Sequence, residues 1–184
     1  MNSGGMDVPN KDLRDWIKEL ESNGQLQHVS GADHHEEIGA IVDIHMHKMT
    51  NPAVMFDEIP GFPKENRVLA NILTSVPRIN LALGKPVDTS EIELVNYWRE
   101  YMKDQPTHAP VEVNGGPLIE NVFEGDDINI KTIPAPKWHE LDGGYFIGTA
   151  CMVLLRDPDT GWINYGAYRV QSHDAKTASV MVSK

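Results

Sequence analysis

Apolar residues recur at intervals of three and four along the start of the chain, which is the spacing of one helix face. The first such segment begins at Lys11 and ends at Gly24, with Asn10 or Asp12 available as its capping residue. A second covers residues 35–49 and carries acids in its first turn, where the helix dipole favours them. The pattern predicts two helices joined by a short extended stretch.

Shorter apolar runs follow. Residues 53–59 and 68–73 have the composition of β-strands and flank a turn rich in proline and glycine. A third helix is expected over residues 78–83, and a fourth begins after Thr89 or Ser90. The fourth has an apolar stripe that we expect to be buried, formed by Ile92, Val95, Trp98 and Met102.

Beyond residue 110, apolar and polar residues alternate between clusters of Gly, Pro and Asp. A period of two predicts strands. The clearest unit is a hairpin over residues 145–171 with its turn at 157–161, and a further strand is expected over residues 178–183. We therefore predict an α+β fold in two parts. These are an α/β domain in residues 1–108 and a β-rich domain in residues 109–184.

The composition excludes several classes of partner. The net charge of −11 comes from 27 acids against 16 bases, without a dense basic cluster, which argues against nucleic acid. No apolar run reaches the roughly 18 residues of a membrane span. The single cysteine, Cys151, lies in an apolar run, which indicates a buried thiol rather than a nucleophile. We expect a cytoplasmic protein.

Two histidines form a sequence pattern that metal-dependent amidohydrolases use, His45-Met46-His47. On a strand the two rings would share a face, but this segment has helical periodicity, which points them about 200° apart. The residues 33–37 contain ligand-type side chains, but capping and the dipole at a helix start explain them better than a metal site does. The triad-like residues 172–174 are consecutive and fit a turn. Metal binding by His45 and His47 remains a minor alternative.

The second strand of the predicted hairpin offers a different chemistry. Asn164 carries a hard oxygen suited to Mg²⁺ or Mn²⁺, and Arg169 carries a cationic fork suited to phosphate. The two are an odd number of residues apart, so a regular strand sends them to opposite faces. Gly166 between them permits a bulge or a close approach of the backbone to a ligand, and either would let both residues reach one cofactor. The alternative is an ordinary half-buried strand with Arg169 in a surface ion pair.

The hairpin resembles the signature of the UbiD family. The resemblance rests on Gly148-Thr149-Ala150, on residues 156–161, and on residues 164–169 with Gln171. Supporting motifs occur in the expected order at residues 12–14, 81–84, 134–139 and 142–144. This resemblance implies an N-terminal α/β domain followed by the first strands of a split β-barrel like that of flavin reductases.

Members of that family reversibly decarboxylate aromatic, heteroaromatic or α,β-unsaturated acids through an adduct with prenylated FMN. The resemblance therefore implies prenylated FMN with Mn²⁺ and often K⁺ as cofactors. It also implies a flavin prenyltransferase as cofactor supplier, a small carboxylic acid as substrate, and self-association as a homo-oligomer. An alternative is a non-catalytic β-rich binding or assembly subunit that keeps the hairpin for packing.

The resemblance also assigns roles to residues. Asn164 matches the metal-ligating asparagine, and Arg169 matches the catalytic arginine that orients the substrate carboxylate. The matching cofactor contacts are Ala167, Tyr168, Arg169, Gln171, Met181, Val182 and Ser183. The family's other metal ligands and its catalytic glutamates have no counterpart in these 184 residues. We therefore expect this stretch alone to be inactive.

Overall fold

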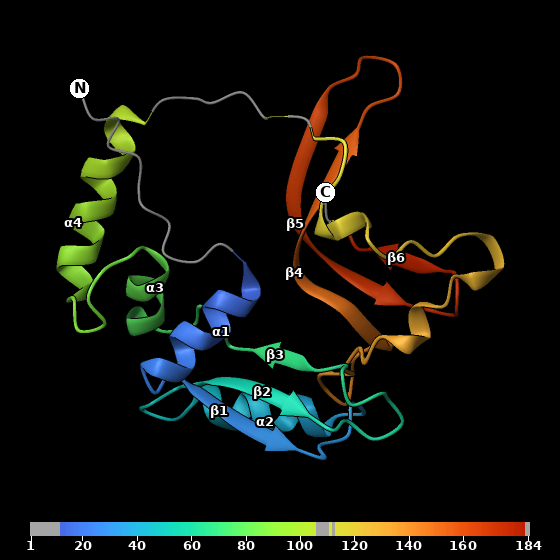
Figure 1. Cartoon of the computed structure of the whole chain (residues 1–184), viewed down its shortest axis with the longest axis horizontal. Helices are drawn as coiled ribbons and strands as arrows, with labels where there is room; N and C mark the ends of the chain where they lie inside the picture. Colours follow the sequence, from blue (N-terminus) through green and yellow to red (C-terminus); the bar gives the residue numbers. More distant parts are fainter. Residues whose placement is uncertain (1–11, 106–110, 112, 183–184) are drawn as a thin grey trace. The chain divides into compact units, whose positions relative to one another are not determined.

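The computed structural model describes residues 12–105, 111 and 113–182. Its helices are α1 Leu13–Ser22, α2 Glu37–Met46, α3 Val76–Ala82 and α4 Glu91–Tyr101, with short 3-10 helices at Met102–Asp104, Pro117–Ile119, Gly125–Asp127 and Ile130–Thr132. Its strands are β1 Leu26–Ser30, β2 Ala53–Asp57, β3 Val68–Ala70, β4 Tyr145–Arg156, β5 Ile163–Ser172 and β6 Ala178–Val180. Figure 1 shows them coloured along the sequence. Among the described residues, no helix is long and apolar enough to cross a membrane.

The strands form two three-stranded sheets, in the orders β1-β2-β3 and β4-β5-β6. This arrangement confirms the predicted α+β class. The chain divides into two compact units built from interleaved segments. The first unit comprises Met1–Gln27, Lys48–Val54 and Ala70–Val122, and the second comprises His28–His47, Met55–Leu69 and Phe123–Lys184. The predicted domain division at residue 108 stays a prediction.

The first unit contains α1, which begins as its sequence predicts. Asp12 caps the helix, because its Oδ1 accepts hydrogen bonds from the backbone N–H of Arg14 at 2.7 Å and of Asp15 at 3.0 Å. Trp16 and Leu20, one turn apart, are buried. The cap and the apolar face therefore fix both the start and the orientation of this helix.

The same unit buries an arginine on α3. Arg78 is fully buried, and its guanidinium donates to the carbonyl of Asn51 and, at 2.8 Å, to the hydroxyl of Thr74. Burial lowers the pKa of Arg78, because desolvation disfavours the charged form. The side chain thus joins the start of α3 to the loop before β2.

Helix α4 differs from expectation in its burial. Its start is as predicted, with Ser90 and Glu93 forming a reciprocal capping box. The four residues of the apolar stripe are exposed, from 43% for Trp98 to 72% for Ile92, whereas Leu94 is buried. The prediction of a buried stripe is wrong for Ile92, Val95, Trp98 and Met102. Periodicity identifies an apolar face, but it does not supply a neighbouring element to cover that face.

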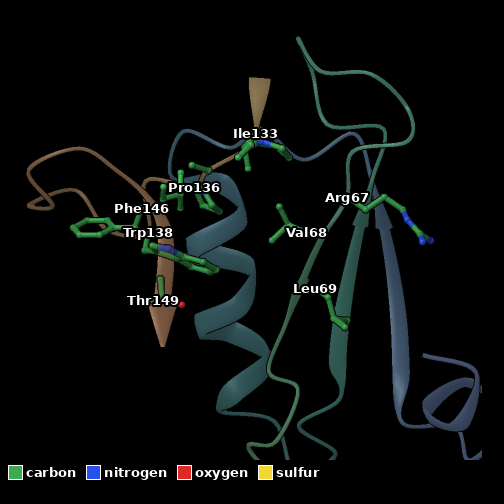
Figure 2. A pocket seen from close by; sticks show the side chains of 11 residues that line it. Arg67, Val68, Leu69, Ile133, Pro136, Trp138, Phe146 and Thr149 are labelled. Atoms are coloured by element: carbon green, nitrogen blue, oxygen red, sulfur yellow. The ribbon is translucent and has the colours of Figure 1, made fainter. Parts of the chain in front are cut away.

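In the second unit, α2 covers one face of the first sheet (Figures 1 and 2). Ile38 and Val42 turn inward from the helix. The backbone of Trp138 approaches the same helix so closely that a Cβ at Gly39 would overlap the Trp138 carbonyl. The segment around Lys137 pairs in parallel with His35, and the Lys137 ammonium donates to Glu36 Oε1 at 2.6 Å. That bond lowers the pKa of Glu36.

The second sheet is built on the predicted hairpin. Strands β4 and β5 are antiparallel and pair regularly from Arg156–Ile163 to Cys151–Tyr168. At the turn, Asp157 Oδ1 accepts the backbone N–H of Asp159 at 3.0 Å and of Thr160 at 2.7 Å. These bonds lower the Asp157 pKa, and the Thr160 N–H makes the largest contribution.

The remaining strand predictions are partly confirmed. Strand β6 ends at Val180, two residues before the end of the described part, and the predicted contact residue Ser183 lies outside it. Cys151 is half-buried rather than buried, and its Sγ lies 3.5 Å from the carbonyl oxygen of Tyr168. The thiol is therefore a packing residue of the hairpin.

Candidate cofactor-binding strand

Strand β5 carries most of the predicted site residues, and its burial alternates along the strand. Asn164, Gly166 and Tyr168 are half-buried, whereas Ala167 and Arg169, which alternate with them, are exposed. Pairing with β4 stays in register through Gly166, so no bulge occurs there. Asn164 and Arg169 therefore project from opposite faces of β5. The expectation that a bulge at Gly166 brings them together is wrong.

The irregularities lie on β4 instead, near its base. Phe146 and Gly148 pair with the successive residues Gln171 and Val170, so β4 carries one extra residue there. A second shift falls between Gly148 and Cys151. Both shifts lie beside the stretch of β5 that contains Arg169. Bulges of this kind commonly redirect side chains next to functional sites.

Arg169 has two partners near the base of the hairpin. Its Nη1 lies 3.6 Å from Oδ1 of Asp142, and its guanidinium carbon lies 4.5 Å from the centre of the Phe146 ring. The Asp142 side chain is 11% exposed and that of Arg169 is 47% exposed. One end of the guanidinium is thus held by a carboxylate and an aromatic ring, while about half of the side chain remains open to solvent.

Two other predicted contacts lie on the same face as Arg169. The Gln171 amide donates to the carbonyl of Gly143 at 3.2 Å, and a Cβ at Gly144 would lie 2.8 Å from that amide. The backbone N–H of Met181 donates to the carbonyl of Arg169 at 3.2 Å, which places Met181 beside it. The structure therefore brings together Arg169, Gln171 and Met181, and Ala167 follows along the same face. Val182, after the strand, is exposed.

Metal ligands are less complete. Asn164, the predicted metal ligand, lies on the opposite face of β5, and its amide oxygen is the hard donor type that Mg²⁺ or Mn²⁺ prefers. In the part of the chain that the structure describes, no group of three His, Cys, Asp or Glu side chains could hold a metal ion. His45 is buried and His47 is exposed, and each Nδ1 lies within 2.8 Å of a carbonyl oxygen of its own helix. The two rings therefore do not make a metal pair, as the helical periodicity indicates.

A pocket of about 260 Å³ lies in the second unit, beside the base of β4. Figure 2 shows Phe146 and Thr149 of β4 across from Val68 and Leu69 of β3. Most of the lining residues have apolar side chains, and they include Trp138, whose Nε1 is buried without a hydrogen-bond partner. None of the predicted site residues of β5 lines this pocket. Phe146 connects the two features, because it lines the pocket and also contacts Arg169.

Two family models match the chain in tandem. Residues 17–98 match the 3-octaprenyl-4-hydroxybenzoate carboxy-lyase N-terminal domain, and residues 110–184 match the Rift-related domain of the same enzyme. The chain belongs to the UbiD family. The chain corresponds to the N-terminal part of the family's proteins, as the sequence resemblance predicts. The match therefore confirms that resemblance.

Two decarboxylases resemble the chain over nearly its whole length. It is 29% identical to the pyrrole-2-carboxylic acid decarboxylase of Pseudomonas aeruginosa, over 90% of this chain and 35% of that protein. It aligns with the open form of the vanillic acid decarboxylase of Sedimentibacter hydroxybenzoicus, with a TM-score of 0.81 and 28% identity, over 93% of this chain and 36% of the other.

A more distant structure shares the fold alone. It is an evolved dimeric form of HmfF from Pelotomaculum thermopropionicum in complex with prFMN, with a TM-score of 0.75 and 22% identity, over 95% of this chain and 39% of that one. The chain thus spans about 35% of the length of the relatives that it matches. It is homologous to carboxy-lyases, and structures of the UbiD class contain FMN or prFMN.

Sequence reasoning missed Asp142 as a partner of Arg169. The two are 27 positions apart, and periodicity carries no information on such pairs. A usable signal was nonetheless present in Gly143-Gly144, because adjacent glycines just before a strand indicate a close approach of backbone. The approaching group is the Gln171 side chain.

Proposed function

We propose that the protein carrying this chain is a UbiD-class decarboxylase that acts reversibly on an aromatic, heteroaromatic or α,β-unsaturated carboxylic acid, with prenylated FMN. The observation that carries the proposal is Arg169, a half-exposed cation on the same face as Gln171 and Met181, within a chain of this family. A guanidinium there can pair with a carboxylate or a phosphate oxygen. The decarboxylase names of two relatives support the choice of reaction.

The chemistry of the face fits a phosphate-bearing flavin. Ala167 leaves room beside the cation, and the apolar Met181 and Val182 can cover a ring system. Prenylated FMN, when bound, would accept the electrons released as the carbon–carbon bond to CO₂ breaks. Arg169 would hold the substrate carboxylate by its charge and its planar geometry. Gln171, which is bonded to the Gly143 carbonyl, would border the cofactor on the same face of β5.

The described residues do not complete a site for Mn²⁺. Asn164 is the proposed ligand, and the Mn²⁺ and K⁺ of the family would need further ligands from elsewhere in the protein. The proton donor of the reaction would likewise come from elsewhere in the protein. The flavin prenyltransferase and self-association remain part of the proposal, because cofactor supply and assembly belong to the complete protein.

The test uses the complete protein that contains this chain, produced together with a flavin prenyltransferase and Mn²⁺. Pyrrole-2-carboxylate and vanillate are suitable first substrates, with CO₂ release and flavin absorbance as readouts. Arg169→Ala should lower CO₂ release by about a hundredfold or more, as expected for the loss of a charge aimed at the reacting group. Asn164→Ala should weaken flavin retention.

Two variants serve as controls. Arg156→Ala removes an arginine from the turn end of the same hairpin, and Asn114→Ala removes an exposed asparagine; both should behave like the unmodified protein. Unchanged flavin affinity in both site variants would defeat the site assignment. A protein that retains the flavin but releases no CO₂ from any aromatic acid would instead favour the non-catalytic binding subunit.

A further inference from the structure

Asp142 is held in one orientation by its own turn. Its Oδ2 accepts the backbone N–H of His139 at 3.1 Å, and its own N–H donates to the His139 carbonyl at 3.1 Å. The side chain is 11% exposed. With one carboxylate oxygen used by the turn, the other oxygen, Oδ1, faces Arg169 Nη1 at 3.6 Å. A fixed carboxylate therefore meets a long side chain that is about half exposed to solvent.

The surroundings of this pair are also fixed. The backbone N–H of Phe146 donates to the Pro136 carbonyl at 2.9 Å, and the Phe146 ring lies against the guanidinium. The Lys137 ammonium donates to the Glu140 carbonyl at 2.9 Å and so ties the turn to the segment before it. Arg169 thus receives a charged contact and an aromatic contact from one short, internally bonded segment, residues 136–146.

We propose that Asp142 is a positioning residue for Arg169. Its carboxylate engages one edge of the guanidinium, limits the rotamers of Arg169, and leaves the remaining N–H groups directed at an anionic group of the cofactor or substrate. This inference rests on the proposed function, because it gives Arg169 the task of meeting that anion. The competing explanation is that Asp142 only stabilises its turn through His139.

A double-mutant cycle separates the two explanations. Asp142→Asn removes the charge but keeps an oxygen that can accept the His139 N–H. In the complete protein, its effect is measured as the dissociation constant for FMN, from quenching of flavin fluorescence. We expect FMN binding to weaken by about three- to tenfold, which lies in the lower part of the range of coupling between contacting groups. In an Arg169→Ala background the same substitution should have no further effect.

A second measurement needs neither activity nor cofactor. The rate at which phenylglyoxal modifies Arg169, followed by peptide mass in the cofactor-free protein, should rise severalfold in Asp142→Asn. Asp126→Asn is the matched control, since it removes an exposed carboxylate that pairs with Lys176 at 2.7 Å and should change neither value.

Equal weakening in both backgrounds, or an unchanged modification rate, would overturn the inference and leave Asp142 a turn residue. The proposed function fails differently, through the absence of CO₂ release from the unmodified protein. The modification rate would still report on the Asp142–Arg169 pair in that case.

Discussion

Strands β2 and β5 differ in how deeply their residues are buried. Residues 53–56 of β2 are buried without interruption, which is the pattern of a strand covered on both faces. Strand β5 alternates between exposed and half-buried residues along most of its length, and β4 opposite it exposes Met152 and Leu154. This chain covers both faces of β2, whereas the second sheet keeps apolar side chains open to solvent.

This difference in burial means that the region that stabilises the fold and the region that carries the candidate site are not the same. Burial of β2 and α2 contributes the hydrophobic free energy that holds the chain folded. Most of the predicted cofactor residues lie on β5 of the hairpin, where large apolar groups such as Tyr165 are open to other molecules. Substitutions in the first region should therefore affect folding, and those in the second should affect binding.

The sharpest test of this contrast pairs two large-to-small substitutions. Phe56 is fully buried, and Phe56→Ala should lower the free energy of unfolding by about 3–5 kcal/mol, from lost burial and the cavity left behind. Leu154 is 66% exposed, and Leu154→Ala should change it by no more than about 0.5 kcal/mol. Urea denaturation followed by circular dichroism measures both. Similar losses from the two would mean that the hairpin is also part of the core.

A pair of glycines gives a smaller contrast of the same kind. A Cβ at Gly39 meets the backbone of Trp138, which cannot move aside, so Gly39→Ala should cost about 1–3 kcal/mol in urea denaturation. A Cβ at Gly166 meets the Tyr168 ring, which can rotate, so Gly166→Ala should cost about 1 kcal/mol or less.

Gly115→Ala, with open space around the Cβ, is the control for both glycine variants. If Gly166→Ala is as damaging as Gly39→Ala, then the ring of Tyr168 is fixed and the hairpin is more rigid than its exposure indicates.

The smallest effect concerns acid and the hairpin turn. The Thr160 N–H is the main group that holds the pKa of Asp157 below its ordinary value. The ionised carboxylate therefore stabilises the fold at every pH above that ordinary pKa. This contribution is lost as the pH falls through the folded-state pKa. Asp157→Asn should therefore be less stable than the unmodified chain at pH 7, with the gap narrowing in acid.

Denaturation midpoints at pH 7 and in the acid range measure that gap. Thr160→Val removes the hydroxyl bond to Asp157 and the bond that the Trp162 N–H donates to the same hydroxyl at 3.3 Å. It keeps the Thr160 N–H, which contributes most to the low pKa of Asp157, so it should lose less stability at pH 7 than Asp157→Asn does. A gap that stays constant with pH would show that the charge of Asp157 does not support the turn.

Much of the local structure could be predicted from the sequence because local signals determine it. Asp12 and Gly24 bracket α1, Ser90 begins α4, and the cluster of turn residues at 157–161 closes the hairpin. The family could also be recognised, because its motifs occur in order along the chain. For the site, the sequence identified Arg169 and Gln171, which the structure places on one face.

The rest depends on contacts that no local pattern encodes. Exposure of the α4 stripe is set by what packs against Trp98, not by its spacing. Whether Asn164 and Arg169 share a face is set by where the extra residues of the hairpin fall, and these fall on β4 rather than at Gly166. The Asp142–Arg169 pair joins a turn to a strand, and only the fold brings them together.

The two register shifts of β4 have a consequence for how the hairpin tolerates insertions and deletions. A single extra residue would turn Phe146 to the face opposite Arg169, whereas two restore it to the same face. Loss of one residue between Phe146 and Cys151 should therefore disturb the hairpin base more than loss of two. Among homologues, we expect this stretch to change length in steps of two.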